Sequence, residues 1–191
     1  MNDTTIQQFC SAFLAVSGKP HRASTLAQAA ALVVQLAAPL APKPVALANL
    51  PEKWMTAIRD ACGAAGIDVV APPWIHDNLP ARIDDAGLGV TGMAFAIAET
   101  GTLVEITEDD ADRLVSALPR THIGIVAADT LVGAYRDAAG PLRQALGADT
   151  KKCTVSFISG PSRTGDIELK LTLGVHGPEV AHAIILESDE R

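Results

Sequence analysis

Short apolar segments that alternate with helical segments place the strongest limit on how this chain folds. Val45–Asn49 and Ile67–Ala71 are predicted as buried strands, and Pro51 is predicted to open the helix between them. Three later apolar segments are also predicted as strands: His122–Ala127, Cys153–Ser159 and Val180–Leu186. Buried strands that alternate with helices are typical of a mostly parallel sheet covered on both faces. The sequence therefore predicts an α/β fold.

The segments between these strands predict further elements. Val90–Ile106 is apolar and is predicted to form two extended pieces joined by a turn. Helices are predicted over Asp109–Leu118 and Thr130–Leu146. Apolar and polar residues alternate over 167–173, which favours a half-buried strand, with a single helical turn as the alternative.

The first part of the chain has a helical pattern instead. Apolar residues from Ile6 to Phe13 recur with the spacing of one helix face. A second helix is predicted over 24–38, and a series of prolines then stops it. We therefore expect an N-terminal helical arm over residues 1–42, packed on the core or on a partner, and an α/β domain over residues 43–191.

Composition excludes several classes of function. The 191 residues include 15 Lys and Arg against 22 Asp and Glu, a formal charge of −7, and only 4% are aromatic. An acidic chain with few aromatic side chains argues against binding nucleic acid or anionic lipid. The most apolar run, Leu26–Leu40, is too short to span a bilayer, and the polar Met1–Gln8 segment is unlike a signal peptide. We therefore expect a soluble, cytoplasmic protein without membrane insertion.

The cysteines argue against a metal centre in this chain. Cys10, Cys62 and Cys153 are far apart and include no CxxC pair. Neither a zinc ribbon nor a cysteine-ligated iron–sulfur cluster is therefore expected from this chain alone. No His, Asp and Glu triplet has metal-ligand spacing either, so no metal site is predicted.

Three glycine-bearing segments, which we call corners, are the candidate functional positions, because ligands of open α/β sheets bind at the carboxyl ends of strands. The first corner is Ala98–Thr102, in which Glu99 could act as general base or nucleophile. Thr100, Gly101 and Thr102 are predicted to contact a ligand. The alternative is that Glu99 is only a turn acid that accepts backbone N–H bonds.

The second corner, Ser159–Asp166, has the residues expected of an anion site. Its predicted ligand contacts are Gly160, Ser162, Arg163, Thr164 and Asp166. Glycine lets the backbone approach a ligand, and the guanidinium of Arg163 matches a carboxylate or phosphate. The alternative is a capped turn in which Arg163 pairs with Asp166 or Glu168.

The third corner, Gly174–Pro178, contains His176 flanked by glycines at 174 and 177. An imidazole there could carry a proton near neutral pH, or could hold the turn by bonding a backbone carbonyl. We expect the three corners to line one hollow at a rim of the sheet, with Arg163 orienting an anion and Glu99 or His176 facing it.

Together the corners resemble the LUD domain of lactate utilization proteins, and within it the cluster-free C-type form. The resemblance covers roughly Val90 to Glu187. Its motifs are Ile97-Ala98-Glu99-Thr100-Gly101-Thr102-Leu103, Leu118-Pro119 with His122-Ile123, Gly160-Pro161-Ser162-Arg163-Thr164-Gly165-Asp166-Ile167-Glu168 and Gly174-Val175-His176-Gly177-Pro178. Most such domains have Ala or Ser where this chain has Gly165.

The resemblance implies a three-layer, mostly parallel sheet of the ribose-phosphate isomerase and CoA-transferase type. It also implies a role in oxidising L-lactate to pyruvate beside partner subunits that carry the iron–sulfur clusters. The first hypothesis is thus a cluster-free subunit that binds a small organic anion or those partners. The second is an independent enzyme or binding protein for a phosphorylated sugar or CoA thioester. The third is an interaction module whose helical arm docks a partner.

Overall fold

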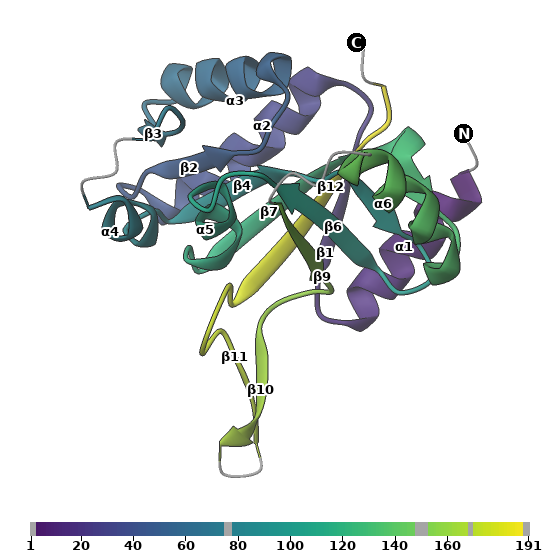
Figure 1. The fold of residues 1–191 in the computed structure, drawn as a ribbon. Helices are drawn as coiled ribbons and strands as arrows, with labels where there is room; N and C mark the ends of the chain where they lie inside the picture. Colours follow the sequence, from purple (N-terminus) through teal and green to yellow (C-terminus); the bar gives the residue numbers. More distant parts are fainter. Residues whose placement is uncertain (1–2, 75–77, 148–152, 168–169, 189–191) are drawn as a thin grey trace.

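A six-stranded parallel sheet forms the centre of the molecule in the computed structural model, which describes residues 3–74, 78–147, 153–167 and 170–188 (Figure 1). Every neighbouring pair in this sheet is parallel. The strands, in spatial order, are β1 (Lys19–Ala23), β12 (Val180–Leu186), β7 (Thr121–Ala127), β4 (Leu88–Gly92), β2 (Val45–Ala48) and β3 (Val69–Val70). The predicted α/β fold with a parallel sheet is confirmed.

Helices cover both faces of this sheet (Figure 1). On one face, α2 (Leu26–Ala37) and α3 (Glu52–Ala64) bury Val33 and Ile58 against strand residues such as Val90. The short helix η1 (Ala38–Leu40) follows α2. The other face is covered by α1 (Asp3–Ala15), α4 (Leu79–Asp84) and α5 (Asp112–Ala117). The sheet is therefore buried on both sides, as its nearly continuous apolar strands require.

A smaller mixed sheet packs beside the central one. Its order is β8 (Leu131–Val132), β5 (Phe95–Ile97), β6 (Thr102–Thr107) and β9 (Thr154–Ile158). Its outer face is covered by the segment that contains η2 (Ala128–Thr130), η3 (Tyr135–Ala138) and α6 (Ala139–Leu146). A hairpin of β10 (Arg163–Ile167) and β11 (Lys170–Leu173) extends away from both sheets (Figure 1).

Two helical predictions are corrected by the structure. The expected helix over 130–146 is an α-helix only from Ala139, because β8 and η3 occupy the residues before it. The expected N-terminal arm is not purely helical, because β1 pairs with β12 in the central sheet. Of the five residues of β1 only Ala23 is buried, so this edge strand has no apolar pattern by which it could have been predicted.

The predicted strand over 167–173 is confirmed for Lys170–Leu173. Ile167 instead ends the separate strand β10, which pairs with it antiparallel. Residues 168 and 169 lie outside the described part of the chain, and with them the predicted alternative pairing of Arg163 with Glu168.

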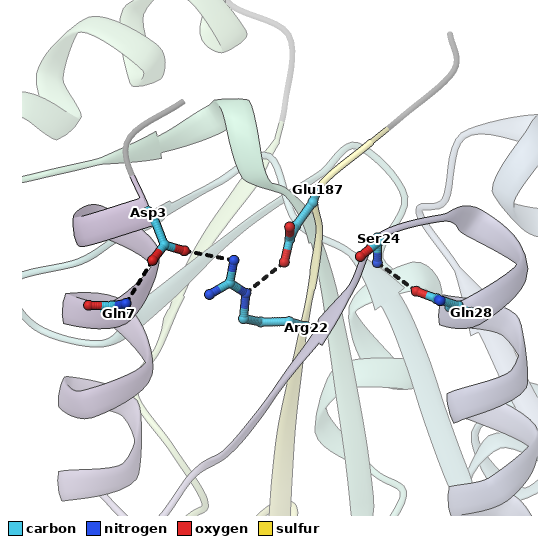
Figure 2. Close-up of polar contacts among 6 residues, drawn as sticks. All are labelled: Asp3, Gln7, Arg22, Ser24, Gln28 and Glu187. Carbon is cyan, nitrogen blue, oxygen red and sulfur yellow. Dashed lines mark hydrogen bonds and ion pairs between the residues drawn. The ribbon is translucent and has the colours of Figure 1, made fainter.

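An ion-paired arginine connects the N-terminal helix to the end of the last strand (Figure 2). The guanidinium of Arg22 on β1 lies 2.7 Å from a carboxylate oxygen of Asp3 and 2.6 Å from one of Glu187. Phe9 and Phe13 of α1 stack on each other and are fully buried. Residues from Asp3 onward are therefore packed on the core, one of the two placements expected for this segment.

Among the described residues, no helix combines the length and the apolar character needed to cross a membrane.

Candidate functional site

The carboxyl ends of β2, β4 and β7 enclose a crevice of about 520 Å³. The chain leaves β2 through α3 on one face and leaves β4 toward β5 of the smaller sheet, so the two connections diverge. Such a divergence between adjacent parallel strands is where open α/β sheets bind ligands. The described residues that line the crevice are Asn49, Leu50, Pro51, Trp54, Gly92, Met93, Ala94, Ile106, Ala127 and Thr130.

Asn49 holds the walls of this crevice together. Its backbone is left-handed, with φ +53°, which asparagine tolerates better than most residues. Its side-chain amide donates to the carbonyl of Gly92 at 3.0 Å and to that of Ile106 at 3.1 Å. Gly92 approaches closely, because a Cβ there would lie 2.2 Å from the Asn49 carbonyl oxygen. Asn49 thus joins the ends of β2, β4 and β6.

Replacing Asn49 with aspartate should destabilise the fold by about 2–3 kcal/mol, because two donated hydrogen bonds become contacts between oxygen atoms. Asn78→Asp is the matched control, since Asn78 is also left-handed but forms no side-chain cap bond to α4. We expect the control to change stability by less than about 0.5 kcal/mol. Urea unfolding measures both, and equal effects in the two variants would contradict the bridging role of Asn49.

The chemistry of the crevice favours a ligand with at most one negative charge. None of the lining residues within the described part of the chain is charged. The first turn of α3 borders the crevice at Pro51, and no side chain caps it. Amide N–H groups at a helix start lack intrahelical acceptors and favour negative charge. The remaining walls are mostly apolar, so a carboxylate attached to an apolar body fits the crevice better than a phosphate dianion.

The first predicted corner lies at the β5–β6 turn and its glutamate is fixed to the backbone. The carboxylate of Glu99 is exposed and accepts the backbone N–H of Tyr135 at 2.7 Å. The hydroxyls of Thr100, Thr102 and Ser159 form a chain with distances of 2.7 and 2.8 Å. The first corner therefore meets the start of the second corner, as expected for residues of one site.

Both corners contact α1 through glycine. Gly101 has φ +59°, and a Cβ there would lie 2.4 Å from the backbone nitrogen of Phe13. Gly160 has φ +77°, and a Cβ there would lie 2.3 Å from the carbonyl oxygen of Val16. Packing against the first helix and the residue just after it therefore explains why glycine stands at these two positions.

The rest of the second corner leads into the hairpin. Arg163 is exposed, and its guanidinium lies 3.5 Å from the carbonyl oxygen of Ser159. Thr164 pairs with Thr172 across the hairpin, and Asp166 follows it in β10. The backbone of Ser162 instead bonds the third corner, donating to Pro178 at 2.9 Å and accepting from Gly174 at 3.0 Å.

The third corner lies at the opposite rim of the sheet from the crevice. His176 is exposed and lines a cavity of about 760 Å³ with Lys43, Gly87 and Thr121, which stand at or just before the starts of β2, β4 and β7. The expectation that this corner stands at carboxyl ends is corrected, because the segment that precedes a parallel strand lies at its amino end. Glu99 and Arg163 are not among the described residues that line the His176 cavity.

The first corner thus contacts the second, and the second contacts the third, whereas the crevice is a separate site. None of the predicted site residues is among the described residues lining the crevice. The crevice residues were missed because they are mostly apolar or glycine. The signal for them was positional: Asn49 directly follows one buried strand and Gly92 ends another, so both could have been chosen.

A buried polar cluster on β4, β6 and β7 was also missed by sequence reasoning. Glu105 on β6 is fully buried and accepts a hydrogen bond from the Ser116 hydroxyl at 2.7 Å. The hydroxyl of Thr91 lies 2.8 Å from Nε2 of His122, which is also buried. Among the described residues, Oε1 of Glu105 has no hydrogen-bond partner.

Burial controls the protonation of this cluster. Burial is the main cause that raises the pKa of Glu105 from 4.5 to about 7. The hydrogen bonds of Ser116 and Thr91 lower this pKa, and the nearby charge of Asp112 raises it. Burial also lowers the pKa of His122 from 6.5 to about 4, with nearby His182 acting in the same direction. Glu105 is therefore the group that changes charge near neutral pH.

Within the described ranges, no group of three or more His, Cys, Asp and Glu side chains is placed to hold a metal ion.

Comparison with known proteins places the chain in a family. The LUD domain family matches residues 6–186. Lactate utilization protein C from Shouchella clausii is 39% identical over 117 residues, which cover 60% of this chain and 51% of that protein. The protein of the same name from Bacillus subtilis is 40% identical over 110 residues, covering 56% of this chain and 45% of that protein. These matches span about half the length of the curated relatives.

A solved structure agrees over almost the whole chain. The crystal structure of a DUF162 family protein from Deinococcus radiodurans is 26% identical and has a TM-score of 0.60. The match covers 96% of this chain and 97% of that one, so the fold is shared from end to end. Since the LUD family match also extends over both N-terminal helices and both sheets, the chain belongs to the LUD domain family.

Proposed function

We propose that this chain is a cluster-free component of a cytoplasmic lactate utilization system, acting beside iron–sulfur subunits that oxidise L-lactate to pyruvate. The observation that carries this proposal is the LUD family match over residues 6–186, together with the lactate utilization protein C name of its relatives. The sparse cysteines agree with a division of labour in which the partners hold the clusters.

The role of this chain in that system is to bind an organic anion. The crevice supports this role through its uncharged walls and the uncapped start of α3. The second corner lies outside the crevice and is proposed as a separate contact for the same class of anion, supported by the Thr100–Thr102–Ser159 hydroxyls and by Arg163 close to Ser159. Proton transfer by Glu99 or His176 remains part of the proposal as a prediction.

A deletion experiment in the source organism tests this function. We expect a strain that lacks the chain to grow poorly on L-lactate and normally on pyruvate, because pyruvate enters after the oxidation step. An epitope-tagged copy should restore growth and co-purify iron–sulfur proteins. Normal growth of the deletion strain on lactate, without any co-purified iron–sulfur protein, would reject the proposal.

The second candidate function is binding of a phosphorylated sugar or a CoA thioester in the crevice. Its position at the carboxyl ends of diverging strands favours some ligand of this size. Thermal unfolding with phosphosugars and CoA separates the candidates, because a ligand that binds the folded state raises Tm. A shift with either ligand would favour this second function, and loss of that shift in Arg163→Ala would place the bound anion at the second corner instead of the crevice.

A further inference from the structure

A second space, which we call the side groove, adjoins the crevice. This side groove has a volume of about 420 Å³ and lies between the β5–β8 pair and α6. Ala94 and Thr130 line both the crevice and the side groove, so the two spaces adjoin. The other described residues that line the side groove are Phe95, Asp129, Leu131, Val132, Pro141, Gln144 and Ala145.

The crevice alone is already too large for lactate. At roughly 30 Å³ for each water-sized atom group, a three-carbon hydroxy acid fills less than about 200 Å³. More than half of the 520 Å³ would remain outside such a ligand, before the side groove is counted. Binding sites with good affinity enclose most of the surface of their ligand. A larger ligand therefore fits this space better.

The distribution of charge sets the direction in which that ligand lies. The side groove is walled by apolar side chains such as Phe95 and Leu131, and its polar members Asp129 and Gln144 are exposed. The carboxylate of Asp129 disfavours a second negative charge in the groove. The described lining of the crevice has no acidic residue. An anionic group therefore belongs in the crevice and an apolar chain in the side groove.

We propose that the crevice and the side groove together bind a monocarboxylic acid with an aliphatic chain of about six or more carbon atoms. This inference rests on the proposed anion-binding function and names the ligand class more closely. The carboxylate lies in the crevice and the chain passes Ala94 and Thr130 into the side groove. Lactate then fills only the first part of the site.

Titration of the purified chain with a homologous series of acids tests the inference. The probes are lactate, butyrate, hexanoate and octanoate, with octanol as the uncharged comparison, all below micelle-forming concentrations. Each buried methylene contributes roughly fourfold in affinity. We therefore expect octanoate to bind at least tenfold more tightly than lactate and butyrate, and more tightly than octanol. Equal affinity across the acids, or octanol binding as well as octanoate, would overturn the inference.

Two variants locate the bound chain. Ala145→Trp and Gln144→Trp fill the side groove from exposed positions on α6, so neither should disturb folding. We expect each to weaken octanoate binding at least tenfold and to leave butyrate binding unchanged. Ala139→Trp, on the same helix but outside the described lining of the groove, is the control. Unchanged octanoate binding in both groove variants would also overturn the inference.

These outcomes are separate from the test of the proposed function. If the deletion strain fails on lactate but octanoate binds no better than lactate, only the ligand class is wrong. If octanoate binds in the side groove but the deletion strain grows normally, the ligand class holds and the lactate system is wrong.

Discussion

The free energy of unfolding of the wild-type chain should fall by about 3 kcal/mol between pH 4.5 and pH 8, and Glu105→Gln should abolish this fall. The pKa of Glu105 rises from 4.5 to about 7 in the folded state, chiefly because the carboxyl is buried. At about 1.4 kcal/mol per pKa unit, this rise corresponds to about 3 kcal/mol. Urea unfolding at pH 4.5, 6, 7 and 8 measures the difference between the two proteins.

The sign of this effect follows from proton linkage. Between pH 4.5 and 7 the unfolded chain has already lost the Glu105 proton while the folded chain retains it. The unfolded state therefore binds fewer protons, and the free energy of unfolding falls as pH rises. The stabilising contribution is fully present below pH 4.5 and is lost once pH exceeds about 7. Glutamine cannot ionise, so its profile should lack this fall.

Other titrating groups do not obscure the comparison. The lowered pKa values of His122 and His182, both about 4, reduce stability as pH falls from 6.5 toward 4 in either protein. This contribution cancels when Glu105→Gln is compared with wild type at the same pH. Glu108→Gln, an exposed substitution directly after β6, is the control and should keep the wild-type profile. Parallel profiles for wild type and Glu105→Gln would show that the pKa of Glu105 is the same in the folded and unfolded states, and would contradict the prediction.

Sequence reasoning identified β2, β7 and β12 because burial on both faces leaves long apolar segments. The two extended pieces predicted over Val90–Ile106 are three strands instead, because β4 of the central sheet and β5 of the smaller sheet are separate. Val180–Leu186 was predicted with the bounds that the structure shows. It failed at β1, where an edge strand of largely exposed residues has no such pattern. Glu105 was missed for a related reason, since a single acid inside an apolar strand looks like a solvent-facing residue. Its burial depends on how the smaller sheet packs against α5, which local sequence does not reveal.

The three corners could be recognised in the sequence as family motifs, but the sequence did not reveal what their glycines contact. Gly160 was predicted to let the backbone approach a ligand, and Gly101 was predicted to contact one. In the structure both glycines lie close to other backbone atoms, at and just after α1. The partner of each contact lies over 80 residues away in sequence. Chain order did contain one usable signal: Gly174–Pro178 precedes a parallel strand, which places His176 at the amino rim.

Gly101→Ala should destabilise the fold by about 3 kcal/mol or more. Its φ of +59° costs an alanine about 1 kcal/mol, and overpacking against rigid atoms typically adds 1–3 kcal/mol. The atoms nearest the added Cβ are backbone atoms of Ala12 and Phe13, which cannot move without displacing α1. Thermal or urea unfolding of the variant measures the loss.

Gly66→Ala separates the two causes. Gly66 has a similar φ of +70°, but a Cβ there would meet nothing within 4 Å, so only the backbone cost of about 1 kcal/mol should remain. The excess in Gly101→Ala over Gly66→Ala then measures how tightly the first corner is packed on α1. If both variants lose the same stability, α1 yields to the added methyl group. The glycine would then need another reason for its place beside Thr100 and Thr102, and contact with a bound ligand would again be the leading one.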